Sequence, residues 1–530
     1  MPKLFRSAPA AAASRPFPSL LSSAEALESR QLMTVVLDAA GYTVVTPERG
    51  DRVVYVSSSA GSDDNDGLSA DHPVRSLSAG ADRLRDGTGD QLLLKRGDTW
   101  RSGLPGWRKS GASADEPMVI GAYGDGPRPS VTPTGSAAGF MTGLSSSPLV
   151  SHVVVQGIRF AAANRDPAAA DFDPAAVANG SYGVQLYAGG TDLLVEDCAV
   201  EAFSTNVAVQ GGLGSLTDVR FRRNVVVDAY ADDGIHSQGF FAHDVAGLLL
   251  EQNVFDHNGW SESPAVTAVG AGRATVFNHD VYLTSSTSGI VVRGNVFADA
   301  ASTGLQARSG GDVLDNLFVA NPIHLDYGLV RGDSGPTPGG VSGTVNGNVF
   351  LGTRRLAGQV RGIGAEIANT RAGGPTVFSN NVFSNAGAAG SDGNGPWDAG
   401  GFAALSLVVG QGKGDAEQAA GLRDLTLQGN IVRDWAAGLS MQSSMRPNAA
   451  GTNGYSGLVV KRNEFSRVSG TMVDHPAAVD GSAERWTGNR YDGAGDEKVL
   501  KIEGRSLAAS DGGAVGGAGG TPAYADPDRS

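Results

Sequence analysis

An asparagine that follows a short apolar run recurs through the second half of the chain. Each copy consists of a strand-like run, the Asn, one further residue and an apolar residue, as in LLEQNVF (249–255) and VVRGNVF (291–297). The copies place this residue at Asn224, Asn253, Asn295, Asn316, Asn348, Asn381, Asn430, Asn463 and Asn489. Their separations are 29, 42, 21, 32, 33, 49, 33 and 26 residues. Repeats of this length are typical of solenoids, and the shortest one suits a coil of three short strands joined by turns.

The repeated Asn has a physical role in such a coil. Asn tolerates the left-handed backbone of a tight turn, and its amide can hydrogen-bond the amide stacked above it. We therefore expect a ladder of stacked Asn side chains. Upstream, VVQGIRF and LVEDCAV fit the same frame and put Ile158 and Cys198 at ladder positions. Cys198, the single cysteine, is expected to be a small inward-facing residue.

The chain is predicted to be all-β. Runs such as VVVQ, LLLE and IVVR are short and rich in β-branched residues or Leu, without helical periodicity. The 76 Gly residues among 530, about twice the usual share, indicate many turns. Three strands per coil and the recurrent Asn resemble the right-handed parallel β-helix of the pectate-lyase-like group. The resemblance covers residues 51–493 and implies about 10–12 coils.

The two ends are expected to differ from this body. Residues 1–50 are interpreted as a largely disordered leader, in which LESRQLM (27–33) resembles the "LE-x-R-x-L" segment near the start of many planctomycete extracellular proteins. That resemblance implies a secreted or cell-surface protein. The stretch 75–87 is compatible with a short N-terminal capping helix. Residues 494–530, rich in Gly, Ala and Asp, are expected to form a flexible tail.

Charge and composition exclude several functions. A net charge of −14 argues against a nucleic-acid-binding surface, and no apolar run approaches the length of a membrane span. One cysteine provides neither a disulfide nor a thiolate metal site. The acidic cluster Asp63, Asp64 and Asp66 is interpreted as a structural turn, with a Ca²⁺ site as the alternative. No metal ligands are assigned and no other cofactor is expected, and we expect a monomer.

Stacked aliphatic side chains fill the interior of a β-helix, so functional residues must lie on an outward strand face or in the loops above it. The expected second strands of four coils are GIHSQ (234–238), DVYLT (280–284), GLQAR (304–308) and PIHLD (322–326). Alternation predicts that Ile235, Val281, Leu305 and Ile323 point inward. It also predicts two outward columns, His236, Tyr282, Gln306 and His324 in one and Gln238, Thr284, Arg308 and Asp326 in the other.

Two carbohydrate-directed chemistries fit this polar patch. A polyuronate lyase or epimerase needs a base, an acid and a cation beside the substrate carboxylate. His279 or Tyr282 could be the base, His236 or His324 the acid, and Arg308 the cation. NHD at 278–280 resembles, loosely, the D-P-H-D motif of mannuronan C5-epimerases, which implies a role for His279 and Asp280. A glycoside hydrolase would instead use two of Asp232, Asp233, Asp280 and Asp326.

The sequence therefore predicts an extracellular protein that binds, and as an enzyme modifies, an acidic polysaccharide. The candidate catalytic residues are His279, Tyr282, Arg308, His236, His324, Asp280 and Asp326. The candidate substrate-binding residues are Asp232, Asp233, Gln238, Gln306 and Arg331. A net acidic protein needs local positive charge to bind a polyanion. We expect this charge to come from Arg308, Arg331, Arg354, Arg355 and Arg361. The alternative is a non-catalytic surface, adhesion or structural module in which HDVYL (279–283) only packs over a turn.

Overall fold

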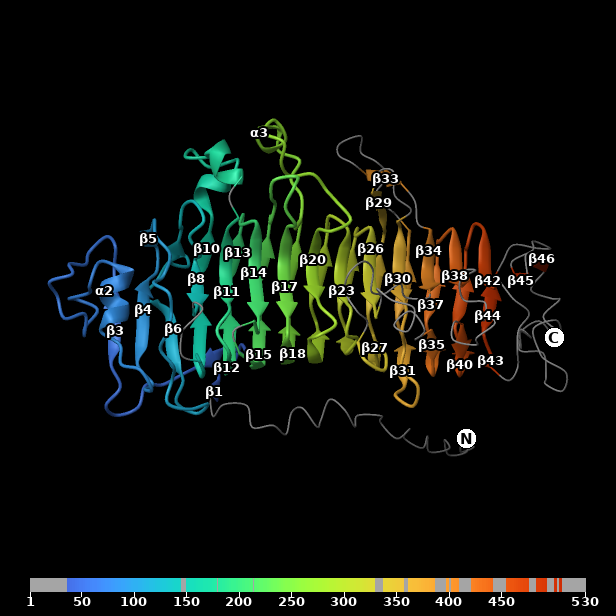
Figure 1. Cartoon of the computed structure of the whole chain (residues 1–530), viewed down its shortest axis with the longest axis horizontal. Coiled ribbons are helices and arrows are strands. Elements are labelled where there is room, and N and C mark those ends of the chain that lie inside the picture. The colour runs from blue at the N-terminus through green and yellow to red at the C-terminus, as the bar shows by residue number, and fades with distance from the viewer. Residues whose placement is uncertain are drawn as a thin grey trace, which may run out of the picture.

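The chain forms a right-handed parallel β-helix built from three long sheets (Figure 1). The computed structural model describes residues 36–143, 149–178, 180–212, 214–328, 337–356, 361–386, 397–399, 402–408, 421–441, 454–475, 483–492, 500–502 and 505–507. Each coil contributes one strand to each sheet, and the strands of successive coils pair in parallel. The all-β prediction is confirmed.

The first sheet, sheet 1, has 14 strands among the described residues. In spatial order they are β3 (Val53–Val56), β4 (Gln91–Lys95), β6 (Met118–Tyr123), β9 (Val153–Gln156), β12 (Gly190–Glu196), β15 (Leu216–Arg222), β18 (Val245–Glu251), β21 (Ser288–Arg293), β24 (Asp312–Leu314), β27 (Gly343–Asn346), β31 (Thr376–Ser379), β36 (Leu425–Gln428), β40 (Leu458–Lys461) and β43 (Glu484–Thr487).

Sheet 2 follows the ladder turn of each coil. Its strands are β5 (Thr99–Trp100), β7 (Ser130–Val131), β10 (Arg159–Ala161), β13 (Ala199–Glu201), β16 (Val225–Val227), β19 (Val254–Asp256), β22 (Val296–Ala298), β25 (Leu317–Val319), β28 (Val349–Leu351), β32 (Val382–Ser384), β37 (Ile431–Arg433), β41 (Glu464–Ser466) and β44 (Arg490–Asp492).

Sheet 3 completes the coil and carries the candidate site. Its strands are β8 (Phe140–Thr142), β11 (Tyr182–Leu186), β14 (Thr205–Gln210), β17 (Gln238–His243), β20 (His279–Leu283), β23 (Thr303–Ala307), β26 (Ile323–Tyr327), β30 (Ile363–Ile367), β34 (Ala403–Leu407), β38 (Ala437–Met441), β42 (Thr471–His475), β45 (Leu500–Ile502) and the antiparallel β46 (Arg505–Leu507). Short pairs also form between β29 (Arg354–Leu356) and β33 (Trp397–Ala399), and between β35 (Leu422–Arg423) and β39 (Tyr455–Ser456).

Stacked side chains fill the interior. Two places after the ladder Asn, five successive coils carry Phe, and these rings stack from Phe255 to Phe383. The rings of Phe297 and Phe318 lie 4.7 Å apart and those of Phe350 and Phe383 lie 4.4 Å apart. Each such pair contributes about 0.5–1.5 kcal/mol beyond its buried area. The repeat thus sets the strand register in which the Phe rings of successive coils stack on one another.

The predicted Asn ladder is present. Oδ1 of Asn316 accepts hydrogen bonds from both the backbone N and Nδ2 of Asn295, at 2.8 and 3.0 Å. Nδ2 of Asn316 donates to the Val292 carbonyl and to Oδ1 of Asn348, both at 2.9 Å. Cys198 occupies the predicted ladder position, fully buried, and its backbone N donates to Oδ1 of Asn224.

The residue that adopts the left-handed backbone in this turn is not the ladder Asn, as was predicted. It is the residue before the ladder position, as in Gln252 and Asp315, with φ of 55° and 53°. Gly fills this place before Asn295 and Asn348, at Gly294 and Gly347. The ladder Asn is therefore selected by its amide hydrogen bonds rather than by tolerance of positive φ.

A second polar ladder at the corner between sheets 2 and 3 was not predicted. Nδ2 of Asn206 donates to Oδ1 of Asn258 at 3.1 Å, and Nδ2 of Asn258 donates to Oδ1 of Asp280 at 3.0 Å. Further along, Oδ1 of Asn321 accepts from the backbone N of Ala300. Insertions of variable length follow this corner, which hides its periodicity in the sequence.

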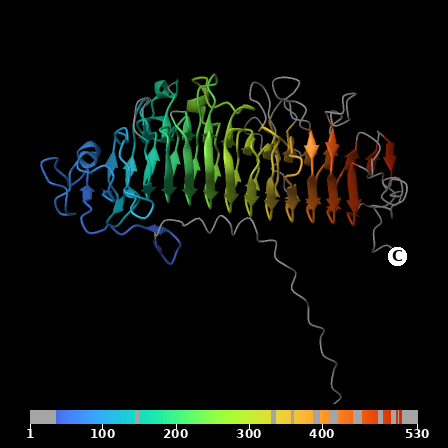
Figure 2. The same cartoon turned by 60° about the horizontal axis from the view of Figure 1, so that its bottom comes forward.

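The described ends extend beyond the predicted body. The capping helix is α2 (Leu77–Asp82), whose N-cap Ser76 accepts from the backbone N of Ala79. A hairpin of β1 (Val36–Leu37) and β2 (Thr43–Val44) lies beside the β-helix (Figure 2). It falls within the region that was expected to be a disordered leader. β45 continues sheet 3 past residue 493. The 14 strands of sheet 1 exceed the expected 10–12 coils because the entry coils lack the ladder Asn.

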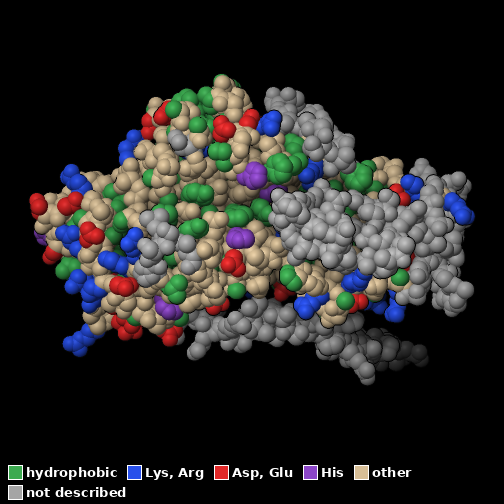
Figure 3. Space-filling model, viewed as in Figure 1, with side chains coloured by type: hydrophobic (Ala, Val, Ile, Leu, Met, Phe, Trp, Pro, Cys, Tyr) green, Lys and Arg blue, Asp and Glu red, His purple; other side chains and the backbone are tan. Residues whose placement is uncertain are grey.

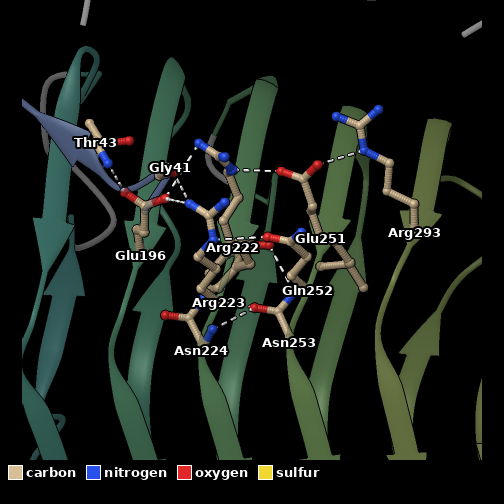
Figure 4. A network of polar contacts seen from close by, with 12 residues as sticks. Gly41, Thr43, Glu196, Arg222, Arg223, Asn224, Glu251, Gln252, Asn253 and Arg293 are labelled. Carbon is tan, nitrogen blue, oxygen red and sulfur yellow. Dashed lines mark hydrogen bonds and ion pairs between the residues drawn. The ribbon is translucent and has the colours of Figure 1, made fainter. Parts of the chain in front are cut away.

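A ladder of alternating charges holds the hairpin against sheet 1 (Figure 4). Glu251 pairs with Nε of Arg222 at 2.6 Å and with Nε of Arg293 at 2.7 Å. Glu196 accepts from the backbone N of Thr43 at 2.8 Å. Arg223, which follows Arg222 in the chain, donates to the Gly41 carbonyl and so ties the hairpin to the coil of β15. Within the described residues, no helix has the length and apolar character needed to cross a membrane.

Candidate functional site

The outward face of sheet 3 carries a polar cluster, here called the sheet-3 face. The predicted alternation is correct for Val281 and Leu305, which pair in register and are fully buried in the core. It is wrong for two of the four coils. β17 begins at Gln238, so Ile235 and His236 precede the strand and are exposed. β26 begins at Ile323, and the His324 ring lies inside the coil against the core rings of Phe318 and Phe350.

The observed register gives three outward columns across the middle coils. One contains Gln238, His279, Thr303 and Ile323, the next Phe241, Tyr282, Gln306, Asp326 and Glu366, and the third His243, Thr284 and Arg308. Tyr282 and Gln306 are neighbours as predicted, but Asp326 joins them in place of His324. In the space-filling view, histidine side chains lie near the middle of this face with hydrophobic side chains beside them (Figure 3).

His279 lies at the centre of the face and is 4% exposed. Its backbone N donates to Oε1 of Gln238 at 3.1 Å, and its ring meets the ring of Tyr282 edge-on, with centroids 5.5 Å apart. Burial, together with Arg308, Arg361 and His236, holds the pKa of His279 well below its usual value. Nδ1 has no hydrogen-bond partner among the described residues. The structure thus presents a neutral imidazole whose buried Nδ1 carries no hydrogen bond from the described residues.

Arg308 provides the cation beside this imidazole. Its guanidinium carbon lies 4.7 Å above the centre of the Tyr282 ring, and its backbone N donates to the Leu283 carbonyl. The cation–π contact holds the guanidinium over the phenol ring. Arg361 also acts on the charge of His279, so two of the five predicted arginines lie near this histidine. Arg354 pairs with Asp299 at the corner between sheets 2 and 3. Arg331 and the Arg355 side chain lie outside the described residues.

Two carboxylates lie beside this group on neighbouring strands. Asp326 and Glu366 are register partners, 3% and 1% exposed. Nε2 of Gln306 donates to Oδ2 of Asp326 at 3.2 Å. The sequence analysis did not identify Glu366, although GAEI (364–367) repeats the inward–outward pattern of HLDY (324–327) and could have extended the column.

Several predicted site residues do not reach the face. Asp280 points into the corner ladder, fully buried, and burial raises its pKa well above the usual range. His324 contacts Asn321 inside the coil, and burial lowers its pKa to about 3. Both positions carry corner hydrogen bonds. Neither side chain therefore lies on the outward surface where a substrate would bind.

The remaining candidates lie at the rim. His236 stacks on Phe277 with ring centroids 5.1 Å apart, and it is close enough to lower the pKa of His279. Asp232 bridges to Ala271, and Asp233 accepts from the backbone N of Arg273, so both hold together the loops above the face.

No metal site is found among the described residues, which contain no group of three or more His, Cys, Asp or Glu side chains that could hold an ion. In the predicted acidic turn, Oδ1 of Asp63 accepts from the backbone N of Arg75 and of Ser76, at 2.9 and 2.8 Å. This carboxylate closes the turn that leads into α2.

Comparison with known proteins supports the fold. No family model and no curated protein matches the chain. Among solved structures, XylC in its complex with xylose is 11% identical, with a TM-score of 0.51 over 84% of this chain and 87% of that chain. The native GH136 lacto-N-biosidase from Eubacterium ramulus is 15% identical, with a TM-score of 0.41 over 83% and 68%. Pectate lyase Pel9A is 14% identical, with a TM-score of 0.34 over 88% and 89%. At these identities the likeness concerns the parallel β-helix fold alone.

Proposed function

We propose that the protein is an extracellular polysaccharide-modifying enzyme that removes a proton beside the carboxylate of a uronate residue, as a polyuronate lyase or epimerase does. The observation that carries the proposal is the contact group of His279, Tyr282 and Arg308 on the sheet-3 face. It unites a neutral imidazole, a phenol and a guanidinium from two adjacent coils. The extracellular location rests on the N-terminal segment at 27–33.

Each member of the group has a role in this chemistry. Arg308, with Arg361, would neutralise the uronate carboxylate and so stabilise the charge that develops when the neighbouring C5–H bond breaks. The neutral His279 would accept that proton. In elimination the electron pair then forms the C4–C5 double bond while the C4–O bond breaks, and Tyr282 would protonate the departing oxygen. In epimerisation C5 instead regains a proton from the opposite face.

A second candidate function is glycoside hydrolysis, favoured by one observation. Asp326 and Glu366 are outward register partners on adjacent strands, which lie about 4.8 Å apart in a sheet. Retaining glycosidases place their two carboxyl groups about 5–5.5 Å apart. This pair differs from the sequence-based prediction, which offered any two of Asp232, Asp233, Asp280 and Asp326.

Purified protein incubated with polygalacturonate, alginate and neutral xylan separates these functions. The proposal expects unsaturated uronate or a changed sugar configuration with an acidic polymer, lost in both His279→Ala and Arg308→Ala. His72→Ala is the control, since His72 is exposed in the turn that precedes α2, away from the sheet-3 face. New reducing ends lost only in Asp326→Asn and Glu366→Gln would establish the hydrolase instead. The absence of activity on all three polymers, with no retarded migration of the protein in polymer-containing gels, would favour the non-catalytic module.

A further inference from the structure

A pocket of about 1200 Å³ lies over the outward side of sheet 2, beyond the loops that rim the sheet-3 face. Its floor includes Arg159 and Glu201 on neighbouring strands, which form an ion pair. Its walls are the loops that follow β10, β16 and β19. An antiparallel contact from Asp232 to Ala271 joins the last two of these loops. The upper loops are visible around α3 (Pro264–Thr267) in Figure 1.

A buried arginine fixes the first wall. Arg165, at the end of η1 (Ala163–Arg165), is fully buried and donates to the carbonyls of Ala202, Ala176 and Val177. The last two belong to η2 (Pro174–Ala178). The guanidinium also lies 4.8 Å from the centre of the Tyr230 ring. One side chain thus ties three loop segments together, so the pocket wall is preformed.

The opposite wall is equally fixed. Nε1 of Trp260 donates to the Asp299 carbonyl at 2.8 Å, and its ring meets the His257 ring edge-on at 4.3 Å. Nδ1 of His257 contacts Oδ1 of Asp228 at 2.7 Å. Backbone bonds from Ser261 to Gly272 and from Gly272 to Ala231 join the loops. The Asp228 carboxylate, whose side chain is 56% exposed, is therefore held in place at the pocket surface.

The lining is acidic and lacks large exposed apolar groups. Five carboxylates, Asp166, Glu201, Asp228, Asp233 and Glu262, face two arginines, Arg159 and Arg273. Both arginines already pair with carboxylates of the pocket. Trp260 and Tyr230 are 4% and 2% exposed, so the surface offered to a ligand consists of carboxylates, hydroxyls and small residues such as Ala163 and Ala274.

We propose that this pocket is a binding site for an oligosaccharide without carboxylate groups, and that amine-bearing sugars bind it best. The exposed apolar part of the lining consists of small Ala and Pro side chains that suit the C–H faces of sugar rings, and sugar hydroxyls suit the carboxylate and hydroxyl partners. The excess of carboxylates repels a polyuronate and attracts an ammonium group. The pocket would therefore select against the substrate class proposed for the sheet-3 face, and the inference does not depend on that proposal.

The test uses the full chain, with histidine ring NMR signals as the local probe and calorimetry for affinity. The ligands are tetramers of glucosamine, N-acetylglucosamine and galacturonate. We expect the glucosamine tetramer to bind most tightly and to shift the His257 signals. Asp228→Asn and the exposed Glu262→Gln should each weaken this binding at least fivefold. Asp315→Asn is the matched control, because Asp228 and Asp315 both occupy left-handed turn positions, with φ of 58° and 53°.

The outcomes that overturn the proposal are specific. They are the absence of any His257 shift with all three tetramers, a galacturonate tetramer that shifts His257 more than the glucosamine tetramer, or equally tight binding of tetralysine, which would show that charge alone is recognised. Glu262→Gln keeps the test valid if Asp228→Asn unfolds. His279→Ala should leave tetramer binding at the pocket unchanged. A failure of the chemistry proposed for the sheet-3 face can therefore be told apart from a failure of pocket binding.

Discussion

The guanidinium of Arg308 lies over the ring of Tyr282 on the adjacent coil, with 4.7 Å from its central carbon to the ring centre. This contact orients a cation toward the same space that the buried His279 ring borders. The chemistry proposed for the sheet-3 face depends on the guanidinium plane as well as on its charge. A charge-conserving substitution therefore tests the geometry.

Arg308→Lys should lower kcat/KM on an acidic polymer by about tenfold or more, equivalent to about 1.4 kcal/mol, because an ammonium neither stacks on the phenol nor contacts a carboxylate in two places. Steady-state kinetics measures the effect. Arg293→Lys, a change within the charge ladder of sheet 1, is the control and should leave kcat/KM unchanged. Wild-type kinetics in Arg308→Lys would show that the stacked guanidinium has no part in the reaction.

Cys198→Asn should extend the Asn ladder by one turn. Sγ of Cys198 already lies 3.7 Å from the Val155 carbonyl, and the equivalent Val195 carbonyl accepts Nδ2 of Asn224. The new amide can therefore donate to Val155, which predicts a gain of about 0.5–1.5 kcal/mol in the free energy of unfolding. Urea unfolding measures it, with Cys198→Ser as the control that keeps a small polar group but lacks the amide. A loss larger than that of the Ser variant would contradict the ladder account.

Acid should destabilise the protein through its buried histidines. Burial lowers the folded pKa of His324 to about 3, while the unfolded chain titrates near 6.5. The unfolded state therefore binds the extra proton as the pH falls below 6.5, and this one site lowers stability by up to about 1.4 kcal/mol per pH unit. His324→Gln should show a shallower loss of unfolding free energy between about pH 6 and 4.5. Parallel curves for the two proteins would refute the assignment.

The charge ladder of sheet 1 should matter more than exposed ion pairs. Glu251→Gln leaves Arg222, whose side chain is 14% exposed, without its closest carboxylate contact, and should cost about 1–3 kcal/mol of unfolding free energy. Asp434→Asn removes the partner of Arg467, whose side chain is 62% exposed, and should cost less than about 1 kcal/mol. Equal losses measured by denaturant titration would show that burial does not distinguish the two pairs.

The sequence predicted the coil because the residues that define it repeat in fixed order. Asn253 and Asn295 are each followed by the Phe of the core stack, so the ladder and the sheet 2 register can be read directly. Sheet 3 strands follow insertions of different length, and nothing local marks their first residue. For this reason His236 was aligned with Tyr282, whereas the register pairs Tyr282 with Phe241, five residues further along the chain. His324 was placed outward although it follows Asn321 at the corner, where side chains turn inward.

The pocket over sheet 2 could not be read from sequence at all. His257 and Trp260 stood out only as isolated residues, and their partners Asp228 and Asp299 belong to neighbouring coils. Arg165 gave no signal of burial, because its partners are backbone carbonyls on loops distant in the chain. Contacts between insertions depend on loop conformation, which the repeat does not specify.

Incubation with polygalacturonate and alginate in D₂O, followed by NMR of the recovered sugar, tests the central claim most directly. Proton removal at C5 predicts either deuterium at C5 with inverted configuration or a C4–C5 double bond at new chain ends, and His279→Ala should abolish both. New saturated reducing ends with hydrogen retained at C5, formed equally by His279→Ala, would contradict the proposed chemistry of the sheet-3 face.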